Sequence, residues 1–233
     1  MASCLLCLNQ SHRESVTELK MKNNMVNKAL VSLSLLVGLM SVGAQAASSI
    51  TLNDEFDYRG QKVALDMDVG QAELIAGDQD KVRVEVVVKA NDSKWFGFWQ
   101  NSDVSSAKFD ILDDGDKLVL RLADQDDVNQ KWRVYLPRNA ALKVDAGVGE
   151  VIVDGLSASI EVELGVGRAE ITHQASFGDV SLESGVGEVS IRDGGQRLKV
   201  NQNLVSQSYH QQGTAGDDHL YVSVGVGEID VRN

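Results

Sequence analysis

Alternating apolar and polar residues flank a repeated Gly-Val-Gly triplet in the second half of the chain. The clearest copies span Val144 to Val153, Val162 to Ile171, Leu182 to Ile191 and Val222 to Val231. Alternation with period two predicts half-buried strands, and the two glycines permit a sharp bend where a Cβ would clash. Each copy is therefore expected to form a strand, a tight corner and a second strand. At the corners we expect the central valines to point into the core: Val148, Val166, Val186 and Val226.

The spacing of the copies indicates a repeat architecture. The first glycines of the triplets, Gly147, Gly165, Gly185 and Gly225, are spaced by 18, 20 and 40 positions. The long gap is expected to hide a degenerate copy over residues 198–209, and an outlying copy lies at residues 63–74. One supersecondary unit per fixed period is typical of a solenoid. We predict an all-β chain that forms a β-solenoid with Gly-Val-Gly corners, and the alternative is a β-sandwich of hairpins.

Stacking in sequence order has consequences for charge and for the chain end. The residues after successive triplets, Glu150, Arg168 and Glu188, would alternate in sign along the stack. The last copy ends at Val231, so the C-terminal strand would form an open edge of the sheet. Such an edge offers a route to self-association or to docking of a partner.

The first half of the mature chain also has a β pattern, with one aromatic interruption. Residues 50–136 alternate in strand fashion, for example at Val82, Val84, Val86 and Val88, and Pro137 closes this region. The interruption contains Trp95, Phe96, Phe98 and Trp99. These side chains either plug the open end of the coil stack, which we favour, or form an exposed tip that contacts a partner.

The N-terminal residues have the features of an export signal. Lys22 and Lys28 precede an apolar stretch over residues 29–43, and Ala44-Gln45-Ala46 forms a small-x-small cleavage site. We assign residues 1–20 to a doubtful leader from a mis-assigned start, 21–46 to the signal peptide, 47–140 to an N-terminal β region and cap, and 141–233 to the regular coils. The last two regions are expected to be continuous as one domain. Both cysteines, Cys4 and Cys7, fall in the leader.

Charge excludes one class of partner. The chain has 22 basic and 34 acidic residues; removing residues 1–46 takes away four and two of these, which leaves 18 and 32 and a net charge of −14. Nucleic-acid binding requires clustered Lys and Arg, which the sequence lacks.

No motif for catalysis or cofactor binding stands out. The Gly-Val-Gly-Glu phrase is followed by a strand pattern, whereas a phosphate-binding loop precedes a helix. The acidic clusters at residues 113–116, 124–127 and 217–219 do not have the spacing of a calcium loop. We assign no catalytic, cofactor-binding or metal-binding residues and expect a protein that is not an enzyme.

Three features together resemble a family. They are Leu74-Ile75-Ala76-Gly77-Asp78 before a Val-rich strand, Trp132-Arg133-Val134-Tyr135-Leu136-Pro137, and the Gly-Val-Gly repeat. Residues 63–233 resemble the bacterial exported "putative adhesin" family of unknown function. The resemblance implies a β-solenoid of the cell envelope and brings no catalytic residues.

The resulting functional hypothesis is a non-catalytic, adhesin-like scaffold that binds an envelope protein or glycan through a flat β face. We expect it in the periplasm, with the cell surface or secretion as alternatives. A polysaccharide-acting hydrolase and a self-assembling structural protein are the alternative functions.

Overall fold

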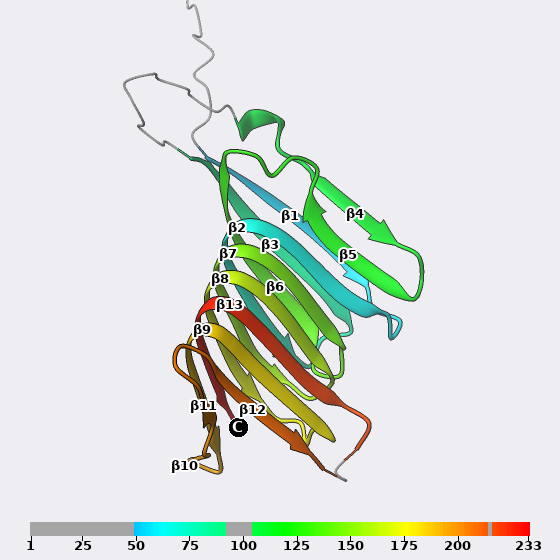
Figure 1. Ribbon diagram of the computed structural model, residues 1–233. Coiled ribbons are helices and arrows are strands. Elements are labelled where there is room, and N and C mark those ends of the chain that lie inside the picture. The colour runs from blue at the N-terminus through cyan, green and yellow to red at the C-terminus, as the bar shows by residue number, and fades with distance from the viewer. Residues whose placement is uncertain (1–48, 92–103, 214–215) are drawn as a thin grey trace, which may run out of the picture. The chain divides into compact units, whose positions relative to one another are not determined.

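The computed structural model describes residues 49–91, 104–213 and 216–233 (Figure 1). They belong to one compact unit, residues 46–233. The protein is all-β. Its strands are β1 (Ser49–Asp57), β2 (Lys62–Gly77), β3 (Lys81–Ala90), β4 (Phe109–Asp113), β5 (Lys117–Leu122), β6 (Val128–Pro137), β7 (Leu142–Leu156), β8 (Ile160–His173), β9 (Asp179–Asp193), β10 (Gln196–Arg197), β11 (Asn201–Gln202), β12 (Gln207–Gln212) and β13 (His219–Arg232). The helical element in the described part is a short 3-10 turn, η1 (Val104–Ser106), and no described helix is long and apolar enough to cross a membrane.

Five long, curved strands form the centre of the molecule, in the spatial order β2, β7, β8, β13 and β9 (Figure 1). They run parallel to one another, and each bends in its middle, so that it has an N-terminal arm and a C-terminal arm. The arms of β2 have different neighbours: its first residues pair with β5, and residues 70–77 pair with β6. Short connections lead from the C-terminal arm of β7 to β8 and from that of β8 to β9, whereas further strands intervene after β2 and after β9. This is the two-armed coil of a β-solenoid, as the sequence predicts.

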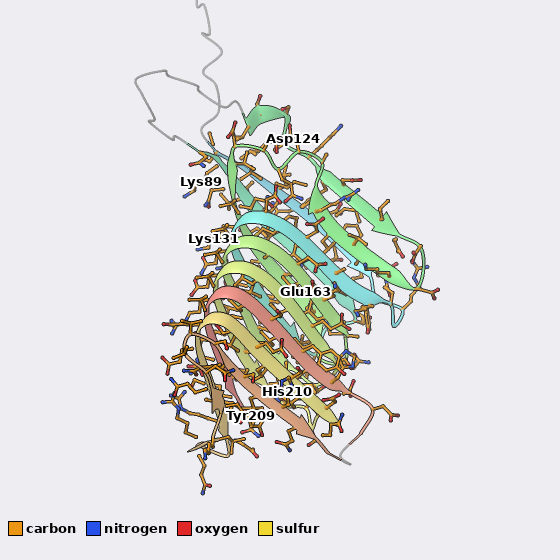
Figure 2. All side chains as sticks on the ribbon, viewed as in Figure 1. Lys89, Asp124, Lys131, Glu163, Tyr209 and His210 are labelled. Carbon is orange, nitrogen blue, oxygen red and sulfur yellow. The ribbon has the colours of Figure 1, made fainter. Side chains whose placement is uncertain are left out.

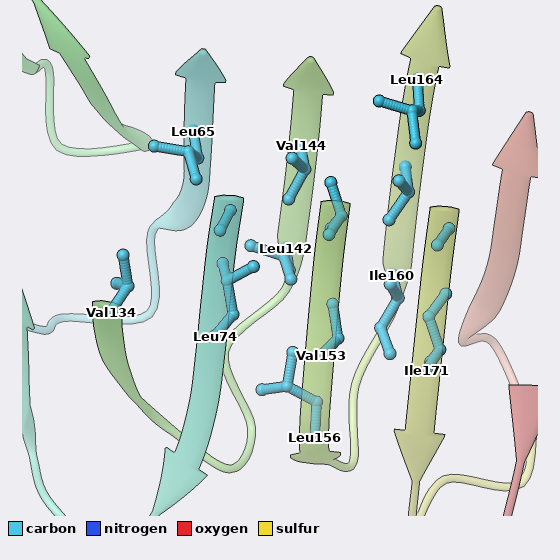
Figure 3. Close-up of a cluster of buried hydrophobic side chains, with 14 of the residues drawn as sticks. Leu65, Leu74, Val134, Leu142, Val144, Val153, Leu156, Ile160, Leu164 and Ile171 are labelled. Atoms are coloured by element: carbon cyan, nitrogen blue, oxygen red, sulfur yellow. The ribbon is translucent and has the colours of Figure 1, made fainter. Parts of the chain in front are cut away.

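The core lies between the two layers of arms (Figure 3). On β7, Leu142 and Val144 are buried before the corner, and Val151 and Val153 are buried after it. The buried positions thus change from even to odd numbers across the triplet, so the corner interrupts the regular alternation of the strand. Register pairing repeats these positions on every coil, for example Val144 beside Val162. The layers therefore bury continuous rows of Val, Leu and Ile.

The corners require glycine for two reasons. The second glycine of each triplet has a positive φ, for example 144° at Gly167. A Cβ on Gly167 would also overlap with the backbone oxygen of Gly149 in the neighbouring coil. The first glycines are restricted as well: a Cβ on Gly165 would lie 2.5 Å from the oxygen of Gly147. Glycine at the corner thus allows both the bend and the close stacking of coils.

The triplet valines form one column but do not point into the core, so that expectation is wrong. Val148 is beside Val166, Val166 is beside Val226, and Val226 is beside Val186. Their exposed fractions are 45–48%. The valine lies on the outside of the bend, where its side chain faces solvent.

The order of the last coils also differs from expectation. The final strand, β13, is inserted between β8 and β9 and pairs with both along its length. Arg168 therefore lies beside Glu150 and Glu228, and Glu188 lies beside Glu228. The expected alternation of Glu150, Arg168 and Glu188 is wrong beyond its first pair, and the expected open edge at the C-terminal strand is wrong because β13 is internal.

The predicted degenerate copy over residues 198–209 is not a coil. The segment between β9 and β13 instead forms β10, β11 and β12, and β12 runs antiparallel to the N-terminal arm of β9. The C-terminal arm of β9 is covered by irregular contacts: Val205 accepts a hydrogen bond from Gly187 N, and the Gln207 side chain accepts one from Val189 N. The excursion is a cap on this end of the stack. The outlying copy at residues 63–74 is confirmed as the first full coil, since Gly70 pairs with Gly149.

At the opposite end further strands extend both layers: β5 and β6 pair parallel with β2, and antiparallel pairs lie beyond them. β1, β3 and β6 continue the layer of C-terminal arms, and the β4–β5 hairpin continues the layer of N-terminal arms. Trp132 on β6 is fully buried beside Phe109, with ring centroids 5.9 Å apart, and its Nε1 donates a hydrogen bond to Gln130. The predicted cap or contact tip at Trp95, Phe96, Phe98 and Trp99 lies outside the described residues.

Candidate binding groove on the N-terminal arms

A groove of about 710 Å³ crosses the outer face of the N-terminal arms of the five long strands. Its lining includes six carboxylates and no Lys or Arg side chain. The carboxylates are Asp66, Asp68, Asp145, Glu161, Glu163 and Glu183. Figure 2 shows Glu163 on this face and His210 farther along the same layer. The groove gathers six carboxylates on one face of the described part of the chain, and we take it as the candidate functional site.

The repeat itself aligns the carboxylates. Asp66, Asp145, Glu163 and Glu183 each stand two positions before the first residue of a triplet or, for Asp66, of its Asp-Val-Gly variant. Register places them in one row across the coils, with Ser223 of β13 between Glu163 and Glu183. Because neighbouring strands lie about 4.8 Å apart, the row presents negative charge at a regular spacing. Like charges at this spacing repel, so the row costs stability unless cations compensate it.

Two lysines compensate part of this charge. Lys143 Nζ lies 2.8 Å from Glu163 and 3.3 Å from Asp145. The hydrogen bond with Glu163 contributes most to raising the pKa of Lys143, and burial opposes it. At the groove's edge, Lys62 Nζ lies 2.7 Å from Glu161. Both lysines are thereby fixed by carboxylates.

Glu161 is held in its ionised form. His219 Nε2 lies 3.0 Å from its carboxylate, opposite Lys62. Burial acts to raise the pKa of Glu161, but the hydrogen bonds from Lys62 and His219 together outweigh it, and the pKa is lowered. Glu161 is thus a charged acceptor at neutral pH and not a proton donor.

Asp66 and Asp68 are the uncompensated end of the groove. Within the described part of the chain neither carboxylate forms an ion pair. The backbone N–H of Asp68 donates a hydrogen bond to Gln125 Oε1, and Asp68 itself is exposed. These two groups are available to a cationic group of a ligand.

An aromatic ring and a polar cluster complete the other end. Tyr221 is 39% exposed, stacks on His219 with centroids 4.4 Å apart, and donates its hydroxyl proton to Asp179. Its ring thus offers a fixed flat surface. Beside it, His210 Nδ1 lies 3.0 Å from Ser181 Oγ, and Nε2 lies 3.3 Å from Glu183.

Ser181, His210 and Glu183 are the residue types of a nucleophilic triad, but their setting differs. The side chains of His210 and Glu183 are 51% and 59% exposed on the open face of the sheet. A triad activates serine in a site that excludes water and offers donors to an oxyanion. An open strand surface provides neither feature, so the cluster is better suited to hydrogen-bonding a ligand.

The sequence interpretation missed this site. The only contact residues it named were Trp95, Phe96, Phe98 and Trp99, which lie outside the described part. A usable signal was present, since an acidic residue recurs two positions before most triplets. Period two places that position on the outer face, and the stacking then forms the row.

The chain is similar to solved structures but matches no family model and no curated protein. Among solved structures, the chain is similar to a "putative cell adhesion protein" from Clostridium sporogenes, with 16% identity, a TM-score of 0.44, and coverage of 79% of this chain and 99% of the other. It is also similar to a "putative adhesin" from Bacteroides fragilis, with 9% identity, a TM-score of 0.24, and coverage of 81% and 100%. Both proteins carry adhesion names, and at these TM-scores neither likeness establishes a shared fold or function.

Proposed function

We propose that this protein is an exported, adhesin-like binding scaffold of a bacterial cell envelope, and that it acts without catalysis. Its binding site is the acidic groove on the N-terminal arms, and its partner is an extended, positively charged polypeptide segment. The observation that carries this proposal is the row of carboxylates, which the coil register aligns across β2, β7, β8 and β9. The signal-like N-terminus supports export.

The charges favour a basic partner over a neutral one. The six lining carboxylates face no lining Lys or Arg, and Asp66 and Asp68 lack ion pairs in the described residues. A chain of Lys or Arg side chains would relieve the repulsion along the row. The ring of Tyr221 could also stack with an Arg guanidinium.

A hydrolase is the alternative that the groove raises, because glycoside hydrolysis uses two carboxyl groups. One of these must be protonated at neutral pH to act as the general acid. Glu161, the carboxylate with the least exposed side chain among those in ion pairs at the groove, is instead held ionised by Lys62 and His219. Binding is therefore the better-supported function.

Titration with defined peptides tests the proposal. A labelled lysine-rich peptide should bind residues 47–233, and binding should weaken as the salt concentration rises. The double variant Asp66→Asn, Asp68→Asn should lose much of the affinity. The matched control Asp80→Asn, Asp154→Asn removes two exposed carboxylates outside the groove and should retain it. Equal losses in both double variants, or tighter binding of a neutral glycan than of the peptide, would refute the proposal.

A further inference from the structure

The cap leaves one short strand edge open. β12 pairs with the N-terminal arm of β9 on one side. On its other side, β11 covers only Gln207 and Ser208. From His210 to Gln212 the strand is exposed, and no described strand pairs with its outer side.

The backbone alternation shows which groups point outward. The N–H of Asn203 bonds to Ser206 O at 2.9 Å, which closes the β11–β12 hairpin. Two residues later, Ser208 again directs its N–H and C=O toward β11, opposite Asn201. His210 and Gln212 follow at the same period and therefore direct theirs outward. Odd-numbered residues are expected to direct their backbone groups toward β9 instead. Gly213 does so, since its N–H bonds to Gly178 O, just before β9.

The cap also differs from the rest of the chain in charge. Residues 194–213 contain Arg197, Lys199 and His210 but no Asp or Glu, in a chain with 34 acidic residues. The edge strands at the opposite end carry acidic residues that discourage pairing between like edges. They are Asp54, Glu55 and Asp57 on β1, and Asp110 and Asp113 on β4. Two copies of this acidic protein can therefore approach each other at β12 with the least repulsion.

We infer that β12 pairs antiparallel with β12 of a second copy, about a two-fold axis at Gln211. In this register His210 lies opposite Gln212 of the second copy, and the two residues exchange both backbone hydrogen bonds. The same exchange occurs in the symmetry-related pair, so every outward group of His210 and Gln212 is satisfied.

Other registers fit less well. An axis at His210 leaves the outward groups of Gln212 unpaired, and would bring Gln212 against the strand position that β11 already occupies. An axis between two residues would place inward side chains opposite outward ones, because strand side chains alternate. A closed two-fold dimer is also the commonest symmetric assembly.

The dimer has a functional consequence. Pairing of the two β12 strands joins the two layers of N-terminal arms into one sheet. Because the two-fold axis is perpendicular to this sheet, the outer faces of both layers point to the same side. The two acidic grooves would then lie on the same face, and a partner with two basic segments could bind both. The dimer itself depends only on β12 and does not require that the groove binds anything.

Charge swapping at the axis tests this inference. Residues 47–233 should show a dimer fraction in sedimentation velocity that rises with concentration. Gln211→Lys and Gln211→Glu should each be monomeric at every concentration, because each places like charges opposite each other. A mixture of the two variants should dimerise again. Thr51→Lys on the exposed edge of β1 should leave the dimer unchanged, and circular dichroism should confirm that all variants fold.

Cysteine cross-linking tests the register. Residues 47–233 contain no cysteine. Gln211→Cys should form an intermolecular disulfide on oxidation, because the residue lies opposite itself at a distance that a disulfide spans. His210→Cys alone should not, whereas a mixture of His210→Cys with Gln212→Cys should. A strictly monomeric wild-type protein, an open-ended polymer, or a dimer that persists in both charged variants would overturn the inference.

Discussion

Arg168 on β8 lies 3.1 Å from Glu228 on β13, Nη2 to Oε2, although Glu188 holds the equivalent position in the next copy along the chain. The contact exists because β13 returns past β9 and inserts beside β8. Glu188 finds another cation, Arg197 on β10, at 2.9 Å. The insertion thus changes which charges meet on the outer face of the C-terminal arms.

Double-mutant cycles test this order of strands, because they measure the coupling energy between two side chains. The pair Arg168→Ala and Glu228→Ala should show a coupling of about 0.5 kcal/mol, because both side chains are about half exposed and solvent screens the pair. The pair Arg168→Ala and Glu188→Ala should show coupling near zero. Urea unfolding of the single and double variants gives both values. A larger coupling for Glu188 would contradict the insertion of β13.

The corner glycines should be among the least replaceable residues. Gly167→Ala combines a positive φ of 144° with an overlap between the new Cβ and Gly149 O. We expect a loss of more than about 4 kcal/mol in the free energy of unfolding, or failure to fold. Gly115→Ala is the control, since Gly115 has a φ of 91° but open space around it. It should lose about 1–2 kcal/mol, the cost of the backbone conformation alone.

The valine column should be nearly neutral to truncation. Val166→Ala truncates a residue that is 45% exposed, so the free energy of unfolding should change by less than about 1 kcal/mol. Leu182→Ala, at a fully buried position of β9, should cost about 2–5 kcal/mol. Urea denaturation compares the two. A cost at Val166 that approached the cost at Leu182 would mean that the valine packs in the core.

Glu161 should contribute to the acid sensitivity of the fold. Its pKa is lowered in the folded state from the ordinary value of 4.5, despite the opposing effect of burial, because Lys62 and His219 hydrogen-bond to the carboxylate. A lowered folded-state pKa stabilises the protein above the unfolded-state value, and this contribution is lost as the pH falls through the folded-state value. The stability difference between wild type and Glu161→Gln should therefore be largest at and above about pH 5 and should shrink below pH 4.5.

Urea unfolding at a series of pH values measures that difference. Lys62→Met removes one of the two donors and should reduce the same pH-dependent part. If the difference between wild type and Glu161→Gln were independent of pH from 6 to 3, the ion-pair account of Glu161 would be wrong.

Export predicts a defined mature N-terminus. The protein recovered from the envelope of an expressing bacterium should begin at Ala47, because Ala44-Gln45-Ala46 provides the cleavage site. N-terminal sequencing checks this. Peptides from residues 1–20 in the precursor would contradict the assignment of these residues to a mis-assigned start, and retention of residues 21–46 in the envelope fraction would contradict cleavage.

The local pattern was enough to predict the coil but not the direction in which the valine at its corner points. Alternation around each triplet correctly predicts two arms and a bend, since period two and glycine act within a few residues. The outward direction of Val148 depends on how the strand turns at the corner. In the sequence, the only trace of this turn is that the apolar positions, which are buried in the structure, change from even to odd numbers between Val144 and Val151. The groove was predictable in the same way from Asp145, Glu163 and Glu183, once the copies are stacked.

The sequence by itself determined the all-β class, the glycine corners and the in-register stacking of like positions, because these follow from side-chain alternation and backbone sterics within one copy. Only the tertiary structure decided that β13 lies between β8 and β9, and that β12 is an open edge. Equivalent copies offer nearly identical surfaces, so local preference cannot rank their spatial order. The order depends instead on how the excursion between β9 and β13 covers the end of the stack, which is a property of the whole fold.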